Sequence, residues 1–511
     1  MLSVLLGACV ALYVMVQLLI VGYASHRYLT LWRCFRRSSR EPVRRAPASR
    51  PLPTVTVQLP LFNERLVAER LIDAVARLDY PPALLQIQVL DDSTDETTAL
   101  VSAAVERHRS RGVPIELHHR EALDGFKAGA LAPGSRWSKG EILVAFDADF
   151  LPPPGFLRQI VPHFAEPDVG MVQARWCHLN RDRSLLTMAQ AVMLDAHFFL
   201  EHRARARAGL FFNFNGTAGA WRRACIESAG GWSHDTLTED LDLSYRAQLA
   251  GWRFVFDAAI EAPAELPAGI AAFKTQQRRW TRGSIQTARK LLPAIFRSRL
   301  PPRVKIESFM HLTGNAPYPL LLALGLLLLP VLIAPPVRES GGLLILELFV
   351  IALGFVPVCA FLVAGQLASG ARGWRVARDV AAALVVGAGL SLNNAIGMIE
   401  GLRGELGDWQ RTPKTGDGVP ALKTGSQAPY LLRRTRQGAV ELLLASYFAL
   451  LALVPLSRGQ LKALPFMLLL ALGFGCFGLL SYREARAAGP RPGRLTRVRE
   501  SSSLRAWPTG S

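Results

Sequence analysis

The stretch LLQIQVLDDSTDETTALV, residues 84–101, holds the features that decide the fold. A short apolar run ends at Asp91 and Asp92, and a polar turn then leads into residues with helical spacing. Alternating strands and helices predict an α/β domain whose sheet is rich in parallel strands. The same alternation recurs on either side of this stretch, in TVTVQLP (54–60), ERLVAERLIDAVARL (64–78) and EILVAFDADF (141–150).

Acidic residues stand at the ends of two predicted strands. Asp91 and Asp92 end one, and Asp147 and Asp149 end the other. An aspartate in such a turn is commonly a cap, but ligands of these sheets bind beyond the carboxyl ends of the strands. A D-x-D turn can direct both side chains to one side, where Mg²⁺ needs few protein carboxylates if a diphosphate supplies further oxygens. The two acidic pairs therefore favour a nucleotide-diphosphate donor.

A third acidic cluster lies in LTEDLDLSYR, residues 237–246, where a polar loop becomes a helix. Glu239, Asp240 and Asp242 would favour the positive end of the helix dipole, and Thr238 could cap the helix. The alternative interpretation is that one of them is a catalytic base. The spacing of the acids leaves both interpretations open.

Phosphate binding by a glycine-rich loop is not indicated, because the chain has no GxxxxGK[ST] and no GxGxxG after a strand. A bound diphosphate would depend on a metal ion and basic side chains. Lys127, in the glycine-flanked GFKAGAL, is a candidate; a solvated surface lysine is the alternative.

Apolar segments at both ends predict a polytopic membrane protein. Residues 2–24 carry no charge over a length that can cross a bilayer, and basic residues follow them, as in an uncleaved anchor with its basic side in the cytoplasm. Further apolar segments lie at 315–335, 341–366, 379–398, 437–456 and 463–481.

The predicted topology needs one segment that does not cross. Five full crossings after residue 300 would place the basic tail opposite the soluble domain, so 379–398, with Asn393 and Asn394, is predicted to be re-entrant or interfacial. The predicted organisation is an anchor and basic segment (1–37), a linker (38–53), an α/β domain (54–300), a membrane domain of about four spans plus that segment with a cytoplasmic loop at 401–436 (301–482), and a basic disordered tail (483–511).

The charge distribution argues against nucleic acid as a partner, and the cysteine content argues against a zinc site or a disulfide framework. The net charge of +19 lies mostly in linkers, loops and the tail, without aromatic interleaving, so anionic membrane lipid is a better partner than nucleic acid. The six cysteines are scattered without CxxC spacing, which argues against a zinc site or a disulfide framework and fits a cytoplasmic catalytic domain.

An ordered set of motifs carries a family resemblance: LDDSTDET, GFKAGAL, FDADF, FNGTAGAWRR, TEDLDLSYR and QQRRWTRGS, between membrane segments. The chain resembles the processive, inverting family-2 glycosyltransferases with a GT-A (Rossmann-like) fold, which include cellulose, chitin and hyaluronan synthases. VQARWCHLN and FNFNGTAGAWRRACIESAGGW are most similar to the cellulose-synthase-like A branch, the mannan and glucomannan synthases.

The resemblance implies roles for individual residues. Asp240 would be the general base with Glu239 in support, while Asp242, facing another side of the helix, would be helix decoration. Chemistry agrees, because inverting transfer needs a carboxylate to take the acceptor proton and cations to stabilise the leaving diphosphate. The remaining implied contacts are Asp91, Asp92, Lys127, Asp147, Asp149, Gln276 and Arg279 with the donor, Asp149 and Asp147 with Mg²⁺ or Mn²⁺, and Gly216, Thr217 and Trp280 with the acceptor.

Simpler interpretations of these motifs remain. QQRRW could be a basic helix face on the membrane with Trp280 as an interfacial anchor, and FNGTAG could be a plain loop. WQRTPKTGD, residues 409–417, is similar to the gating loop of cellulose synthases but begins with Trp409 and carries Arg411 in place of an apolar residue. A basic juxtamembrane loop is the alternative for this stretch.

The predicted function is transfer of a hexose from UDP-glucose or GDP-mannose to the end of a β-linked polysaccharide, coupled to export, at a bacterial inner membrane. One alternative is transfer of a single sugar to a lipid acceptor, as the similar ceramide glucosyltransferases do. Another is an inactive scaffold subunit. The Q-x-x-R-W motif and the downstream membrane segments favour the polymer.

Overall fold

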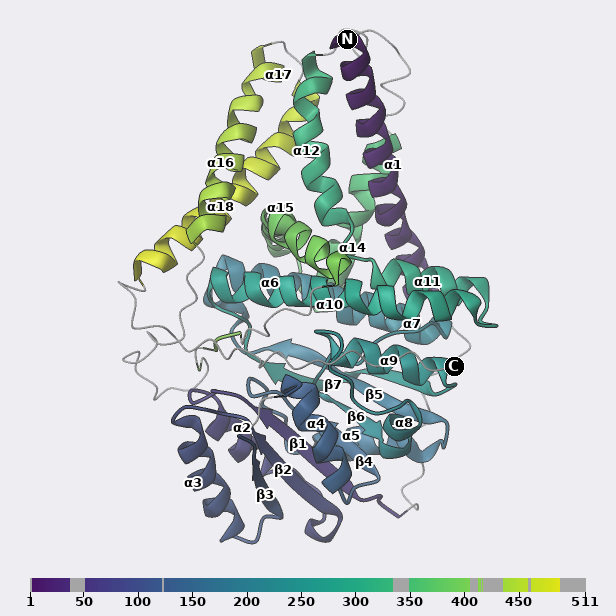
Figure 1. Ribbon diagram of the computed structural model, residues 1–511, viewed down its shortest axis with the longest axis vertical. Helices are drawn as coiled ribbons and strands as arrows, with labels where there is room; N and C mark the ends of the chain where they lie inside the picture. Colours follow the sequence, from purple (N-terminus) through teal and green to yellow (C-terminus); the bar gives the residue numbers. More distant parts are fainter. Residues whose placement is uncertain are drawn as a thin grey trace, which may run out of the picture.

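The central element is one mixed sheet of seven strands, shown in the lower half of Figure 1. The computed structural model describes residues 2–36, 51–121, 124–333, 349–404, 412–414, 416, 435–457 and 461–487. The strand order is β3-β2-β1-β4-β6-β5-β7, and only β6 runs antiparallel to its neighbours. The strands are β1 (Val55–Leu61), β2 (Leu85–Asp91), β3 (Ile115–His119), β4 (Ile142–Ala145), β5 (Val169–His178), β6 (Gly219–Arg222) and β7 (Arg253–Ala264).

The prediction of a parallel-rich α/β sheet is confirmed. β1 pairs in parallel with β2 on one edge and with β4 on the other, and side chains on both of its faces are buried. The EILVAFDADF stretch is a shorter strand than expected. β4 ends at Ala145, which pairs with Gln58 of β1 and Gly219 of β6. The acids of the D-x-D sequence follow this last pair and therefore belong to a turn.

Short helices cover the sheet and connect its strands (Figure 1). Apolar side chains of Val57, Val89 and Val144 are completely buried in the core between the sheet and these helices. Burial of this apolar surface is the main stabilising contribution to the domain. The helices are α2 (Ala68–Val75), α3 (Thr97–Arg109), α4 (Phe126–Trp137), α5 (Phe156–Ile160), α8 (Arg223–Ser228) and α9 (Glu239–Leu249).

A layer of helices separates the sheet from a bundle of long apolar helices, and Figure 1 shows this layer across the middle of the molecule. The 62° bend between α11 and the next helix turns the chain from the layer into the bundle. The layer contains α6 (Leu185–Ala196), a π-helical segment (His197–His202), α7 (Arg203–Ala208), α10 (Ile270–Arg297) and α11 (Pro302–Leu312).

The bundle makes the chain an integral membrane protein. Among the described residues, five helices are long and apolar enough to cross a membrane, and the bent pair of α11 and α12 would be a sixth. The bundle helices are α1 (Leu2–Phe35), α12 (Pro317–Ile333), α14 (Val356–Ala368) with a π-helical turn before it (Ile351–Phe355), α15 (Trp374–Arg403), α16 (Thr435–Leu451), α17 (Leu453–Ser457) and α18 (Leu464–Ala487).

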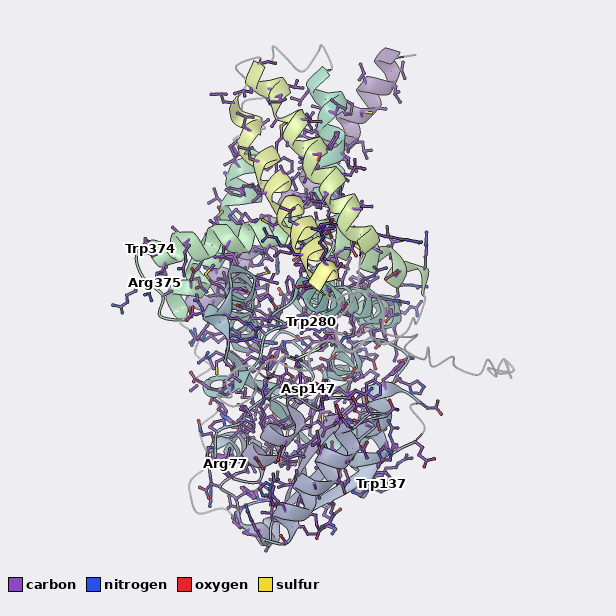
Figure 2. The ribbon with its side chains drawn as sticks, turned by 90° about the vertical axis from the view of Figure 1, so that its left-hand side faces the viewer. Arg77, Trp137, Asp147, Trp280, Trp374 and Arg375 are labelled. Atoms are coloured by element: carbon purple, nitrogen blue, oxygen red, sulfur yellow. The ribbon has the colours of Figure 1, made fainter. Side chains whose placement is uncertain are left out.

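Helix α15 contains the segment predicted to be re-entrant or interfacial. It packs on both α6 and α10 of the layer, and Figure 2 shows Trp374 and Arg375, at its start, beside that layer. Its length and composition would also allow a crossing, so the interfacial assignment stays a prediction. Most of the predicted linker, the loop at 401–436 and the tail lie outside the described residues.

Candidate active site

The two aspartates of the D-x-D turn lie just beyond the end of β4. The chain turns there because the Phe150 N–H donates to the Asp147 carbonyl at 3.0 Å. The Asp147 N–H in turn donates to the Thr217 hydroxyl at 2.8 Å. The Asp147 side chain keeps 36% of its surface exposed and the Asp149 side chain 12%, so Asp147 is the more accessible carboxylate.

Lys127 lies among the acids of this site, so its interpretation as a solvated surface lysine is wrong. Its ammonium group forms an ion pair with Asp147 and donates to the Gly216 carbonyl at 2.8 Å. Burial lowers the pKa of Lys127, but the charges of Asp147, Glu239 and Asp240 outweigh burial and hold that pKa above its ordinary value. Lys127 is therefore a fixed positive charge between β4 and α9.

Helix α9 begins at Glu239 and brings the first two acids of its first turn into the field of Lys127. Burial raises the pKa of Asp240, the neighbouring Glu239 raises it further, and Lys127 offsets them only in part, so this pKa is about 7. Burial also raises the pKa of Glu239. A carboxylate that titrates near neutrality can both accept and release a proton under physiological conditions.

Two expectations for this helix start are wrong. Thr238 makes no capping hydrogen bond; its side chain packs against α10 at Gly283, where a Cβ atom would lie 2.5 Å from Thr238 Cγ2. Asp242 is not decoration, because it is fully buried and paired with Arg246 at 2.7 Å and Lys290 at 2.8 Å. Both residues are used to pack α9 against α10.

Gly216 and Thr217 connect the D-x-D turn with α9. Thr217 is 1% exposed, and its hydroxyl receives the Asp147 N–H, so it supports the turn from behind. Gly216 has φ +80°, and a Cβ atom there would lie 3.0 Å from Asp240 Oδ2. Glycine thus lets the backbone lie against the candidate base. Contact of either residue with an acceptor stays a prediction.

Asp91 and Asp92, at the end of β2, have different surroundings. Asp91 is fully buried and accepts from the Thr98 hydroxyl at 2.8 Å, so it holds the turn after the strand. Asp92 accepts from Arg120 Nε at 2.7 Å, and burial raises the pKa of Asp92 despite this partner. Direct contact of either aspartate with a donor stays a prediction.

Arg120 is not part of any motif in the sequence, yet its guanidinium group also donates to the Phe126 carbonyl at the start of α4. Arg120 therefore joins the end of β2 to the helix that carries Lys127. Its position directly after β3 could have indicated that Arg120 lies near the site, since residues just beyond the carboxyl ends of parallel strands surround ligand sites.

Helix α10 carries the Q-x-x-R-W motif above the sheet. Gln276, Arg279 and Trp280 are half-buried, and Figure 2 shows Trp280 in the helical layer on the side of Asp147 away from the sheet. Burial lowers the pKa of Arg279, whereas nearby Glu239 and the two D-x-D acids oppose this effect. The guanidinium group therefore lies within electrostatic reach of the acids.

Lys414 belongs to the stretch that resembles a gating loop. Lys414 is one of the described residues of that stretch. It is 8% exposed and forms an ion pair with Asp149. Trp409 and Arg411 lie outside the described residues. The pairing brings residue 414 to the D-x-D turn, a contact that the sequence motifs did not predict. The gating role stays a prediction.

The described residues contain no group of three or more His, Cys, Asp or Glu side chains that could hold a metal ion by themselves. The D-x-D carboxylates, Asp147 and Asp149, therefore fit a divalent cation only if a bound ligand provides further oxygens. A nucleoside diphosphate meets this requirement.

Residues 53–283 match the family model described as "Glycosyltransferase like family 2". Glucomannan 4-beta-mannosyltransferase 2 of Arabidopsis thaliana is 44% identical over 252 residues, which cover 48% of this chain and 47% of that protein. Glucomannan 4-beta-mannosyltransferase 1 of Oryza sativa subsp. japonica is 41% identical over 268 residues, 52% of this chain and 51% of that protein. The chain thus spans about half the length of these curated relatives.

Among solved structures, the mannosyltransferase PcManGT from Pyrobaculum calidifontis, in complex with GDP-Man and Mn²⁺, has a TM-score of 0.51 and 22% sequence identity, covering 79% of this chain and all of that one. This likeness shows the fold. It confirms the GT-A fold predicted from the motifs, and the match to the family model agrees with the family that the motifs resemble. Residues 53–283 of this chain thus match the family-2 glycosyltransferase model and are similar to glucomannan mannosyltransferases, and they are joined to helices long and apolar enough to cross a membrane.

Proposed function

We propose that this chain is an inverting, membrane-bound hexosyltransferase that extends a β-linked polysaccharide from a nucleotide sugar and couples extension to export. The observation that carries the proposal is the meeting of Asp240, Lys127 and Asp147, which come from three separate elements. They combine a carboxylate that titrates near neutrality with a fixed cation beside the D-x-D turn. The names of the plant relatives support the polysaccharide product.

The proposed reaction assigns one task to each charge. Asp240 takes the proton from an acceptor hydroxyl while that oxygen attacks the anomeric carbon of the donor. The bond from this carbon to the diphosphate oxygen breaks, and the nucleoside diphosphate leaves with the electron pair. Lys127 and the Arg279 guanidinium group stabilise the negative charge that develops on the diphosphate. Attack opposite the leaving group inverts the anomeric configuration.

We propose Mg²⁺ or Mn²⁺ as the cofactor, held by Asp149 and Asp147 together with diphosphate oxygens. A cation at this position would withdraw negative charge from the leaving group. The solved mannosyltransferase with the same fold was determined with Mn²⁺. Both carboxylates pair with lysines here, so the ammonium groups of Lys127 and Lys414 hold positive charge where the cation would bind.

GDP-mannose and UDP-glucose are the proposed donors. The relatives are named as mannosyltransferases that make glucomannan, which favours GDP-mannose as the first donor to test. The proposed location is a bacterial inner membrane with the glycosyltransferase domain in the cytoplasm, where nucleotide sugars are made. The curated relatives above are plant proteins, so their names do not support a bacterial location. Membrane fractionation of the native host tests it.

The decisive experiment incubates the purified protein in lipid nanodiscs with labelled GDP-mannose or UDP-glucose, Mg²⁺ or Mn²⁺, and a short β-linked oligosaccharide. We expect products longer than the acceptor by many sugars with at least one donor. Asp240→Asn should lose at least about a hundredfold in kcat, because the base is removed while the site keeps its shape.

A matched control is Glu106→Gln on α3, whose side chain is 69% exposed and far from the site. It should keep the wild-type rate. Addition of only one sugar, to a lipid and not to the oligosaccharide, would contradict a polymer-extending role. Undiminished transfer by Asp240→Asn would remove its assignment as the base.

A further inference from the structure

The loop from Asn215 to Ala218 holds a strained backbone directly against the reacting groups. Gly216 has φ +80° and Ala218 has φ +54°, a region that alanine seldom adopts. The Gly216 carbonyl accepts from Lys127, and its Cα lies beside Asp240. A strained segment persists only where its surroundings hold it. A small shift of this loop would therefore move the candidate base and the cation relative to each other.

Two histidines hold the side chain of Asn215. His202 Nε2–H donates to Asn215 Oδ1 at 2.6 Å, and the Asn215 amide nitrogen donates to His197 Nε2 at 3.0 Å. The backbone N–H of Asn215 donates to Gln173 Oε1 at 2.9 Å. Both ends of the Asn215 side-chain amide and its backbone N–H are thus hydrogen-bonded. These bonds fix the position of the first residue of the loop.

The hydrogen-bond pattern places a proton on His202 Nε2 and requires the His197 imidazole to be neutral. An amide oxygen can only accept, so His202 carries its proton on Nε2. An amide nitrogen can only donate, so His197 Nε2 is unprotonated and its proton is on Nδ1, which lies 2.8 Å from Glu201 Oε2. Protonation of His197 would place two donors face to face and break the bond to Asn215.

The π-helical segment is what allows both histidines to reach one side chain. Residues five apart in an α-helix lie roughly 140° apart around its axis and cannot face the same partner. In the segment His197–His202 the wider turn brings the two rings to 4.4 Å between centroids. Such segments occur frequently at functional sites in proteins.

The surroundings of the two rings keep His202 uncharged. Burial lowers the pKa of His202 far below its ordinary value, and the charge of nearby Arg205 lowers it further. The Glu201 carboxylate accepts from His197 Nδ1–H, and Arg27 and Arg205 pair with that carboxylate. The titratable and charged groups around the rings are Glu201 of the same segment, Arg205 of α7, Arg27 of α1, Tyr245 of α9, and His311 and Glu307 of α11.

We propose that His197 and His202 are positioning residues for sugar transfer: they clamp Asn215 and so hold the Gly216–Ala218 backbone against Asp240 and Lys127. This inference rests on the proposed function.

The test compares His197→Phe with His197→Gln in nanodiscs, with the donor that the wild type uses. Phenylalanine removes the acceptor for the Asn215 amide, whereas glutamine retains one in its side-chain carbonyl. We expect His197→Phe to lose ten- to hundredfold in kcat through loss of alignment, with affinity for the nucleoside diphosphate changed less than about twofold. His197→Gln should recover most of the rate.

Rescue by glutamine separates positioning from simple structural support. Glutamine differs from histidine in shape and packing, but it retains an acceptor for the Asn215 amide. A role in packing alone would not be restored by this substitution.

His108→Gln is the matched control, because His108 of α3 pairs with Asp73 of α2, away from the site. It should keep the wild-type kcat. Equal kcat in wild type, His197→Phe and His197→Gln would overturn the clamp while leaving the proposed function intact. A wild type that transfers no sugar to any acceptor would instead overturn the proposed function.

Discussion

Asp240 shows how one side chain acquires its chemistry from neighbours that are distant in sequence. An acidic first helical turn is favourable in any helix. Here burial and Glu239 raise the pKa of Asp240 to about 7, while Lys127, from a helix that begins more than a hundred residues earlier, keeps the pKa from rising further. The site therefore holds a base that changes its charge within the physiological range.

This pKa gives a prediction for the rate of transfer. Because the folded-state pKa of Asp240 is raised to about 7, the carboxyl group is protonated below that pH and cannot accept the acceptor proton. We expect kcat to fall as pH is lowered through 7 and to level off above about 8. The measurement is a pH–rate profile with saturating donor.

A Glu239→Gln variant refines this prediction. Glu239 raises the pKa of Asp240, so removal of its charge should move the acid limb of the profile to lower pH, whatever happens to the maximum rate. An acid limb that stays in place would show that another group controls the rate.

At the scale of elements, α10 links the chemistry to the membrane. It carries Arg279 and Trp280 in its middle, and its Gln286 side chain accepts the Leu237 N–H just before α9. At its start, Lys274 and Glu441 of α16 form an ion pair in which both side chains are completely buried. The bundle therefore sets the position of the helix that faces the D-x-D turn.

The buried pair predicts an asymmetric response to substitution. Lys274→Met leaves the Glu441 carboxylate buried without its cation, so we expect a loss of about 3–5 kcal/mol in the free energy of unfolding. The double variant Lys274→Met/Glu441→Leu should recover most of this loss, since a buried ion pair can often be replaced by apolar side chains. Unfolding in detergent, followed by tryptophan fluorescence, measures both.

The control for this prediction is Lys139→Met, whose side chain is 78% exposed and which should change stability by less than about 0.5 kcal/mol. Equal destabilisation by the single and the double variant would show that apolar packing around residue 274, and not the charge pair, holds α10.

At the scale of the whole molecule, the sheet, the helical layer and the bundle follow one another along the long axis (Figure 1). Charged contacts tie the layer and the turn before it to the bundle. Arg181, just before α6, pairs with Asp379 of α15 at 2.6 Å, and Arg33 of α1 pairs with Glu307 of α11. The N-terminus and α17 lie at the end of the bundle away from the sheet. The glycosyltransferase domain and the α17 end should therefore lie on opposite sides of the bilayer.

Cysteine labelling tests this orientation. In a variant whose six native cysteines are replaced by serine and which still transfers sugar, Ser110→Cys on the sheet domain and Ser457→Cys at the end of α17 are both exposed. We expect a membrane-impermeant maleimide to label only Ser457→Cys in right-side-out vesicles and only Ser110→Cys in inverted ones. Labelling of both from one side would contradict the crossing arrangement.

The sequence by itself determined the alternation of strands and helices, the acids at the strand ends and the apolar segments long enough to cross a membrane. These features depend on local periodicity and composition, which neighbouring residues set. It also identified Asp240 as the candidate base through the order of the motifs.

Only the tertiary structure decided which groups meet. It placed Lys127 between β4 and α9, turned Thr238 and Asp242 toward α10, and brought Arg120, Lys414 and the two histidines of the π-helical segment to the site. Contacts of this kind join residues far apart in the chain, so no local pattern encodes them. Burial and the field of several distant charges, which set the pKa of Asp240, likewise exist only once the chain has folded.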